Sequence, residues 1–306
     1  MNSARPRPFK QVDVFTAEPY RGNALAVVLD GQDLSDDAMQ RFARWTNLSE
    51  TTFLLPPTAP DADYGVRIFT PGGELPFAGH PTLGSCHAWL QAGGQPKDAQ
   101  RIVQQCEAGL VAIRREGTRL AFAAPPLRRS APSPTLLAKV AGALGLKASQ
   151  IVAAQRLDNG PVWLGLLLAD DETVLALAPD HRVLKELGQK VGVAGLPAHT
   201  DETPGSPLIG RSNREARAFA RSEAPPGLTV RAFAAPIGVE EDPVTGSLNA
   251  SLAQWLIAEG HLPESYVAAQ GQRLGRAGRV HVARDAQGQV WVGGDLVTCI
   301  DGQVVL

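Results

Sequence analysis

Residues 241–250, EDPVTGSLNA, are the stretch around which the rest of the chain can be organised. An acidic pair and a proline lead into a Thr-Gly-Ser turn, and the apolar run that follows, to Ala258, is typical of a helix. The first turn of a helix leaves backbone N–H groups unpaired and its dipole favours negative charge, so this stretch can bind a small anion. The simpler interpretation is an ordinary helix start that Thr245 or Ser247 caps.

A second stretch of the same kind lies in the first half of the chain. Residues 77–85, FAGHPTLGS, also end an extended segment and open an apolar run. Arg67 and Arg231 precede the two stretches in similar contexts, and Trp89 and Trp255 follow them in similar contexts. These pairs are separated by about half the chain, whereas solenoid repeats are ~20–50 residues long. The pattern therefore indicates a duplicated domain.

Composition narrows the class of protein. The 306 residues suggest two domains, and 44% hydrophobic with 20% charged residues is typical of a soluble globular protein. A formal net charge of −2 favours neither nucleic acid nor an anionic membrane as a partner. The densest apolar run, 162–169, is too short for a bilayer, and no apolar segment typical of a signal peptide follows the basic N-terminus. The three cysteines have no metal or disulfide spacing, so we expect a cytoplasmic protein.

Periodicity and turn residues predict the secondary structure. A helix is expected to begin after Ser35 and to end at Asn47. Three prolines mark 125–134 as a linker, and a helix is expected from Ser133 or Thr135. Strands are expected at 11–16, 24–29, 51–55, 64–69, 102–105, 110–114, 119–123, 151–154, 161–169, 207–210, 228–235, 280–284 and within 290–305, with a further helix at 181–190.

Several motifs, in one order along the chain, resemble the PhzF-like family of phenazine-biosynthesis isomerase relatives. They are VDVFT at 12–16 with GNA at 22–24, NLSET at 47–51, FTP at 69–71, GHPT at 79–82, EDPVTGS at 241–247 and QGQRLGRAGR at 270–279. The resemblance covers nearly the whole chain and implies the α+β fold of diaminopimelate epimerases and proline racemases. In that fold each of two similar domains wraps a curved, barrel-like mixed β-sheet around a central helix.

The resemblance also implies a domain layout. The first domain would span 1–126 and the second 133–291, and the final segment, 292–306, would return to the first domain. The central helices would begin at Gly79 and Gly246, and their N-termini would face each other across an interdomain cleft that holds the active site. The family further implies a homodimer.

Racemases of this fold use two cysteine thiols, one at each helix N-terminus. By the resemblance these would stand at Ala78 and Thr245, and neither is a cysteine here. Because alanine cannot carry a proton and a threonine hydroxyl is a very weak acid, a two-thiol racemase is disfavoured.

In the PhzF-like family the base is the glutamate of the NLSET motif, which corresponds to Glu50. Its position alone, at the start of an expected strand, is typical of a surface glutamate. The catalytic role of Glu50 therefore rests on the resemblance. A buried carboxylate with a raised pKa can take a proton from one carbon and return it to another. Asp242 and His80 would assist, and Ser247 would hold the substrate.

Further contacts follow from the same resemblance. Gly79, Gly246 and Thr245 would bind a substrate carboxylate at the paired helix N-termini, and Asn23 is a weaker candidate in the early Gly-Asn turn. The substrate loops would include 158–163 and 211–217. No metal and no cofactor is expected.

Other catalytic classes have weaker support. Residues 79–85 have the glycine spacing of a P-loop, but Ser85 stands where the lysine must be. No Gly-x-Gly-x-x-Gly follows a strand, His80 and His87 lack further metal ligands, and Ser247 lacks the nucleophile elbow of hydrolases.

Three hypotheses remain. The first is a cofactor-independent isomerase that moves a proton between carbons of a small unsaturated carboxylic acid. The second is a racemase or epimerase of a small acid, and the third is a non-catalytic binding protein that retains the cleft.

Overall fold

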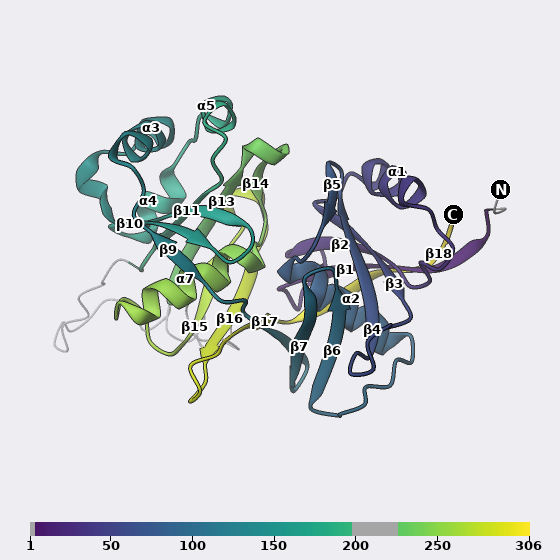
Figure 1. Cartoon of the computed structure of the whole chain (residues 1–306). Helices are drawn as coiled ribbons and strands as arrows, with labels where there is room; N and C mark the ends of the chain where they lie inside the picture. Colours follow the sequence, from purple (N-terminus) through teal and green to yellow (C-terminus); the bar gives the residue numbers. More distant parts are fainter. Residues whose placement is uncertain (1–3, 198–225) are drawn as a thin grey trace, which may run out of the picture.

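The computed structural model describes residues 4–197 and 226–306, which form two lobes around two central helices (Figure 1). The strand expected at 207–210 and the loop at 211–217 lie outside the described residues. The strands of the N-terminal lobe are β1 (Pro6–Val14), β2 (Asn23–Val28), β3 (Glu50–Leu55), β4 (Tyr64–Thr70), β5 (Gly73–Leu75), β6 (Arg101–Cys106), β7 (Gly109–Glu116), β8 (Arg119–Ala123) and the last strand of the chain, β18 (Leu296–Val305).

The C-terminal lobe contains the intervening strands. They are β9 (Arg128–Ser130), β10 (Ile151–Asp158), β11 (Val162–Leu168), β12 (Val191–Gly195), β13 (Leu228–Ala234), β14 (Val239–Asp242), β15 (Ser265–Gln270), β16 (Gly278–Arg284) and β17 (Val290–Gly294). The helices are α1 (Asp36–Thr46) and α2 (Gly79–Gln91) in the first lobe and α3 (Pro134–Leu144), α4 (Asp171–Ala176), α5 (His181–Glu186) and α7 (Gly246–Ala258) in the second.

The two lobes repeat one strand topology. Along β1-β2-β3-β4-β6-β7-β8 the neighbours pair antiparallel, except that β2–β3 and β4–β6 are parallel. Along β10-β11-β12-β13-β15-β16-β17 the corresponding pairs, β11–β12 and β13–β15, are again the parallel ones. A short hairpin strand, β5 or β14, pairs with the fourth strand of each series and leads into the central helix. The duplication predicted from the two glycine stretches therefore has a direct counterpart in the fold.

Each central helix is surrounded by its sheet. α2 contacts β1, β2, β3, β6 and β8, and α7 contacts β10, β16 and β17. Both helices are buried along most of their length, and Leu83, Trp255 and Leu256 have no exposed surface. A helix that is apolar on all sides needs such an enclosure, because no face of it prefers water.

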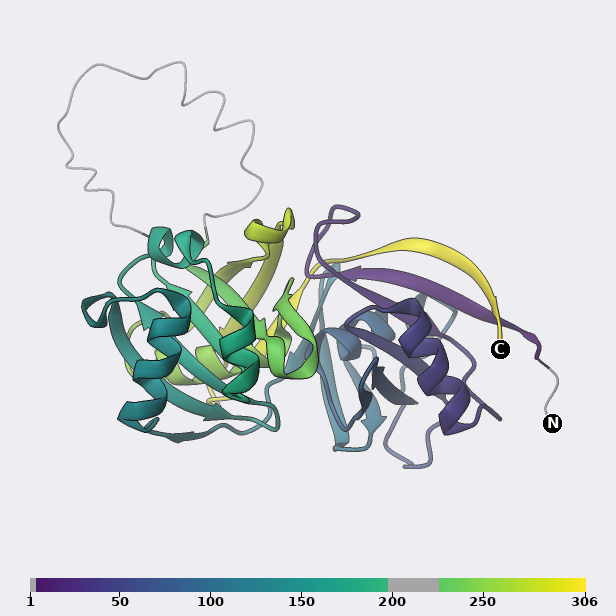
Figure 2. The ribbon, with the colours of Figure 1, turned by 90° about the horizontal axis from the view of Figure 1, so that it is seen from above.

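The chain ends lie together at the far side of the first lobe. β18 pairs antiparallel with β1 from Pro6↔Val305 to Val14↔Leu296, and Figure 2 shows the two long strands side by side. β17 pairs with β8, so the hydrogen-bonded strands continue from one lobe into the other. No helix among the described residues is long and apolar enough to cross a membrane.

Local signals placed several boundaries correctly. The Ser35 side chain accepts a hydrogen bond from the N–H of Ala38 at the start of α1, and Asn47 ends this helix in the left-handed region at φ 53°. Ser133, not Thr135, caps α3, because its hydroxyl accepts from the N–H of Leu136.

Other boundaries differ from the expectation. The helix expected at 181–190 ends at Glu186, because Gly188 adopts φ 64°, the usual conformation just after a helix C-terminus. The expected linker at 125–134 contains β9, which pairs with β10. The expected strand at 151–154 continues to Asp158. α4 and the strands β5, β12, β14 and β15 were not expected at all.

Candidate active site

The two central helices meet at their N-termini. A Cβ atom built on Gly79 would lie 3.1 Å from the Cα of Gly246 and 2.7 Å from the ring of Phe122. A Cβ atom on Gly246 would lie 3.1 Å from the Cα of Gly79. Only glycine allows the two backbones to approach this closely, and the approach places two positive helix ends at one point between the lobes.

Neither helix start is capped by a side chain. Thr245 and Ala78 occupy the N-cap positions of α7 and α2 and make no side-chain cap hydrogen bond. The Thr245 hydroxyl instead donates to Asp242 Oδ2 at 2.5 Å, and Ser247 Oγ accepts from Trp163 Nε1 at 3.2 Å. The interpretation of Thr245 or Ser247 as an ordinary cap is therefore wrong, because both side chains have partners elsewhere.

The uncapped helix starts leave backbone donors open. First-turn N–H groups have no intrahelical acceptor. The Thr245 N–H donates to Gln270 Oε1 at 3.0 Å, whereas no side chain of the described residues accepts from the N–H groups of Gly79, His80, Gly246 or Ser247. These four donors and the two helix dipoles can bind a small anion such as a carboxylate.

Glu50 is the first residue of β3 and points toward this junction. Its side chain is 16% exposed, and its Oε2 lies 3.4 Å from His80 Nε2. Neither of these two atoms has a hydrogen-bond partner among the described residues, although both are buried. Burial, reinforced by the nearby negative charge of Asp242, raises the pKa of Glu50 to about 8, and Lys190 acts in the opposite direction.

His80 is the second residue of α2 and is 4% exposed. Burial lowers the pKa of His80 to about 3, so its ring is neutral at ordinary pH. Its Nδ1 lies 3.4 Å from Asn23 Nδ2. An amide nitrogen cannot accept a hydrogen bond, so Nδ1 is the acceptor and the ring proton is assigned to Nε2, which faces Glu50.

Asp242 comes from the other lobe, at the end of β14. Its Oδ1 accepts from Asn23 Nδ2 at 3.0 Å and from the Ser49 hydroxyl at 3.4 Å, and its Oδ2 accepts from Thr245. Burial raises the pKa of Asp242 to about 6, while the hydrogen bonds from Thr245, Asn23 and Ser49 lower it. Asn23 itself is 2% exposed and holds Asp242 and His80 from behind, a role that the sequence did not suggest.

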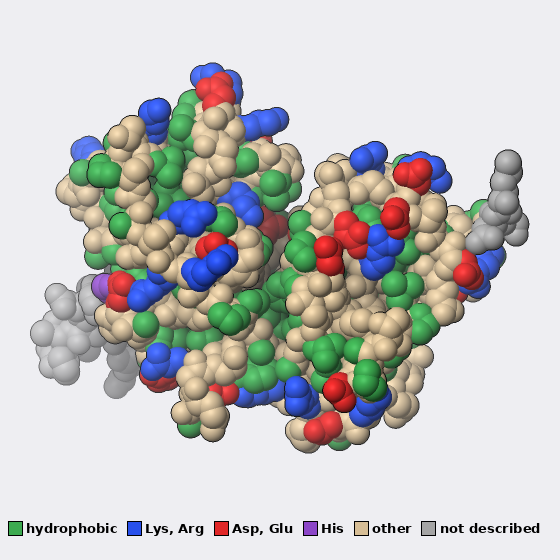
Figure 3. Space-filling model, in the orientation of Figure 1, with side chains coloured by type: hydrophobic (Ala, Val, Ile, Leu, Met, Phe, Trp, Pro, Cys, Tyr) green, Lys and Arg blue, Asp and Glu red, His purple; other side chains and the backbone are tan. Residues whose placement is uncertain are grey.

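A cleft of about 880 Å³ opens onto this junction. Both lobes line it, and Figure 3 shows hydrophobic side chains gathered along the furrow between them. Glu50, Asp242, Thr245 and Ser247 lie on its wall. Among residues 4–197 and 226–306, no three His, Cys, Asp or Glu side chains converge as metal ligands would.

One residue of the cleft was not indicated by the sequence. Lys190 lines the cleft together with Asn159, Gly160 and Trp163 of the expected substrate loop 158–163. Lys190 lies between α5 and β12 and had been assigned to the end of the helix expected at 181–190. No local pattern distinguishes Lys190, because only folding brings it to the cleft.

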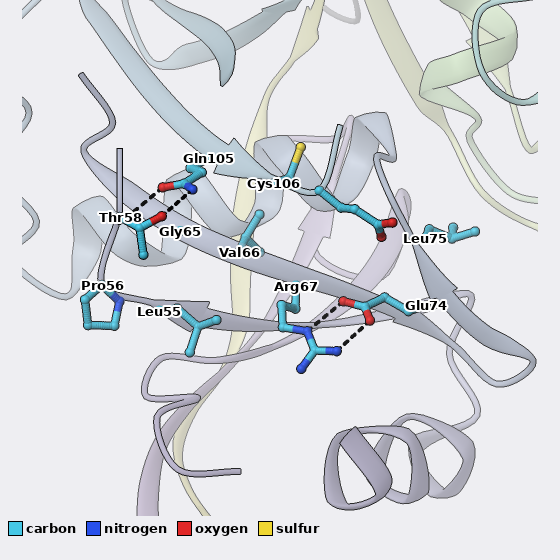
Figure 4. Close-up of a pocket in the computed structure, with 11 residues that line it drawn as sticks. Leu55, Pro56, Thr58, Gly65, Val66, Arg67, Glu74, Leu75, Gln105 and Cys106 are labelled. Carbon is cyan, nitrogen blue, oxygen red and sulfur yellow. Dashed lines mark hydrogen bonds and ion pairs between the residues drawn. The ribbon is translucent and has the colours of Figure 1, made fainter. Parts of the chain in front are cut away.

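A second pocket of about 430 Å³ lies on the outer face of β4 (Figure 4). Several of its polar groups are paired with one another: Arg67 forms two hydrogen bonds with Glu74, and Gln105 donates to Thr58. None of the candidate site residues lines it, so we place the chemistry in the interdomain cleft.

Comparisons with known proteins show to which family the chain belongs. A sequence model of the PhzC-PhzF family, described as phenazine biosynthesis-like protein, matches residues 12–302. The chain is 33% identical over 286 residues to trans-2,3-dihydro-3-hydroxyanthranilate isomerase of Pseudomonas aeruginosa, covering 91% of this chain and 90% of that protein. It is 35% identical to antisense-enhancing sequence 1 of Schizosaccharomyces pombe, covering 96% and 97% of the two chains.

A solved structure extends the likeness to three dimensions. A predicted epimerase from Pseudomonas aeruginosa superposes with a TM-score of 0.75 at 27% identity, covering 98% of this chain and 99% of that one. The expected α+β, epimerase-like fold is confirmed. With a family match over nearly its whole length and relatives that are isomerases, the chain belongs to the PhzC-PhzF family of phenazine biosynthesis-like proteins and is an isomerase.

Proposed function

We propose that this isomerase moves a proton between two carbons of a small unsaturated carboxylic acid, without a cofactor, and that Glu50 is its general acid–base. One observation carries the proposal. Glu50 has a raised pKa and an unpartnered buried oxygen, and it stands on the cleft wall where two uncapped helix N-termini meet. A carboxylate in such a place is suited to exchange protons with carbon.

The junction of the two helix N-termini would bind the carboxylate end of the substrate. The substrate carboxylate would accept from the N–H groups of Gly79, His80, Gly246 and Ser247. Ser247 Oγ accepts from Trp163, so its own hydrogen is available for donation to the substrate. These donors would also stabilise the negative charge that spreads toward the carboxylate when a proton leaves the neighbouring carbon system.

Proton movement then needs one residue. Ionised Glu50 takes the proton from one carbon, the double bond shifts, and the protonated Glu50, whose proton exchanges with solvent in the cleft, returns a proton to another carbon of the conjugated system. A raised pKa makes Glu50 a stronger base than an exposed glutamate, and it leaves the protonated form stable enough to act as the acid. The neutral His80, whose Nε2 lies 3.4 Å from Glu50 Oε2, adds no positive charge that would lower the pKa of Glu50.

The racemase and epimerase alternative needs a base on each face of the substrate. Ala78 carries no proton, so the second base would have to be Asp242. The hydrogen bonds from Asn23, Ser49 and Thr245 occupy both Asp242 oxygens. This favours a single-base isomerase, in which Asp242 positions its neighbours and raises the pKa of Glu50.

Deuterium incorporation tests the proposal directly. The first substrate to try is trans-2,3-dihydro-3-hydroxyanthranilate, on which one relative acts, followed by other unsaturated and hydroxylated carboxylic acids. In D₂O the wild type should place deuterium on carbon, as NMR detects. Glu50→Gln should reduce the rate by about 10²–10⁴-fold, the usual contribution of a general acid–base.

The matched control is Glu186→Gln, the same chemical change at a side chain that is 61% exposed on α5. It should exchange at the wild-type rate. If the wild type binds an acid of the panel but shows no exchange, or if Glu50→Gln exchanges as fast as the wild type, the proposed role of Glu50 is wrong.

A further inference from the structure

Lys190 is the only Lys or Arg side chain on the wall of the active-site cleft among the residues that the structure describes. Its position is fixed by the backbone, because its carbonyl oxygen accepts from the N–H of Leu164 at 2.9 Å and from the side chain of Gln189 at 2.9 Å. No carboxylate of the described residues forms an ion pair with it. The cleft therefore contains one positioned cation whose charge has no direct partner.

Trp163 connects this cation to the helix junction. The Nζ atom of Lys190 lies 5.0 Å from the centroid of the Trp163 ring, and the Nε1 of the same ring donates to Ser247 Oγ at 3.2 Å. Trp163 is 3% exposed and is held in place by this hydrogen bond. Lys190 and the start of α7 are thus both in contact with the indole of Trp163.

The charges in the cleft also favour the binding of an anion near Lys190. Burial lowers the pKa of Lys190, and the Glu50 carboxylate partly opposes this. When Glu50 is protonated during the reaction, that compensation is lost, and a second negative group on the ligand would restore it. The wall of the same cleft also carries apolar residues, with Phe77, Val111, Ile237 and Val239 among them.

We propose that Lys190 and Trp163 form a second substrate subsite, and that the substrate is a small acid with two anionic groups on a flat apolar body. One carboxylate would bind at the helix N-termini and the other anionic group at Lys190. The inference rests on the proposed function for the location of the first carboxylate, and it adds the class of substrate. Trp163 would pack against the body of the ligand and hold the ammonium group of Lys190 by a cation–π contact.

Isothermal titration with benzoate, isophthalate and terephthalate tests the subsite. These probes share one flat ring and differ in the presence and position of a second carboxylate. The wild type should bind at least one dicarboxylate about tenfold more tightly than benzoate, as a charge-assisted hydrogen bond in a partly buried site implies. Lys190→Met should reduce that ratio to about one, with little change for benzoate, and Lys190→Arg should retain part of it.

Lys185→Met, the same change on the exposed side of α5, is the matched control and should keep the wild-type ratio. Unchanged thermal unfolding would show that Lys190→Met is folded, and Lys190→Gln is a second variant if it is not. The inference is overturned if the wild type has no preference for a dicarboxylate, if Lys190→Met keeps the preference, or if it weakens benzoate and the dicarboxylate equally.

The binding ratio and the deuterium assay separate the two proposals. A Lys190-dependent preference without Glu50-dependent exchange would leave the subsite standing and remove the proposed reaction. Exchange that depends on Glu50 but is indifferent to Lys190 and to a second anionic group would leave the reaction standing and remove the subsite.

Discussion

The two lobes share one topology but carry different side chains at equivalent places. Arg67 on β4 and Arg231 on β13 are a clear pair, because each guanidinium lies 5.0 Å from the centroid of a phenylalanine two residues later in its strand. Arg67 pairs with Glu74 and is 27% exposed, whereas Arg231 pairs with Glu241 and is 4% exposed. The difference arises because Arg231 also donates to the carbonyl oxygens of Val174 and Leu177, which cover it.

The same contrast holds at the helix starts. The first lobe supplies a neutral histidine after an alanine N-cap, and the second supplies a threonine N-cap with Ser247 and Asp242 beside it. The first lobe also supplies Glu50, and the second supplies Lys190. Duplication thus accounts for the strand topology shared by the two lobes and for the meeting of two helix dipoles. The proposed chemistry depends instead on residues that differ between the two lobes.

The largest expected effect concerns the two arginines. Arg231→Met should lower the free energy of unfolding by about 3–5 kcal/mol, because it leaves the buried Glu241 carboxylate unpaired. Arg67→Met should cost only about 0–1 kcal/mol, because its ion pairs are partly exposed. Urea denaturation of both variants measures the difference. Adding Glu241→Gln to Arg231→Met should recover part of the loss, and equal losses at the two arginines would contradict the contrast.

A pH-dependent effect is expected from the pKa of Glu50. Its pKa rises on folding from 4.5 to about 8, so the stability it contributes is complete below pH 4.5 and is lost as pH rises toward 8. Glu50→Gln does not titrate, so at pH 9 its free energy of unfolding should exceed that of the wild type. At pH 4 the two should agree.

This prediction also tests the interaction between the lobes. Asp242 raises the pKa of Glu50, so the gap at pH 9 should be smaller when both proteins carry Asp242→Asn. Thermal unfolding across the pH range measures it. A gap that grows as pH falls would mean that the pKa of Glu50 is lowered on folding, and it would remove a premise of the proposed mechanism.

The smallest effect concerns the contact between the helices. Gly79→Ala should destabilise by about 1–2 kcal/mol, because the new methyl group overlaps the Phe122 ring. Gly246→Ala should cost less, because its methyl group meets only the backbone of the partner helix at 3.1 Å. Gly142→Ala is the control, since nothing lies within 4 Å of it on exposed α3 and alanine favours the helix. If all three variants gain stability, the helix ends are not closely packed.

Sequence reasoning found the elements with strong local signals. Ser35 and Asn47 set the ends of α1 through their own side chain and backbone conformation, so they could be read from single residues. β12 was missed because its VGVAG sequence is buried on both faces and shows no alternation. β14 was missed because its VEED sequence is short and polar, and it is a strand only through pairing with β13.

Part of the candidate site could likewise be predicted from the sequence, and part could not. The duplication, the two helix starts and the family motifs could be read from the order of residues along the chain, and the motifs indicated Glu50, His80, Asp242 and Ser247. The tertiary structure alone decided that Thr245 and Ser247 leave their helix uncapped, that Asn23 lies behind the carboxylates, and that Lys190 reaches the cleft. Capping and periodicity depend on neighbours along the chain, whereas burial, desolvation and charge interactions depend on groups that only folding brings together.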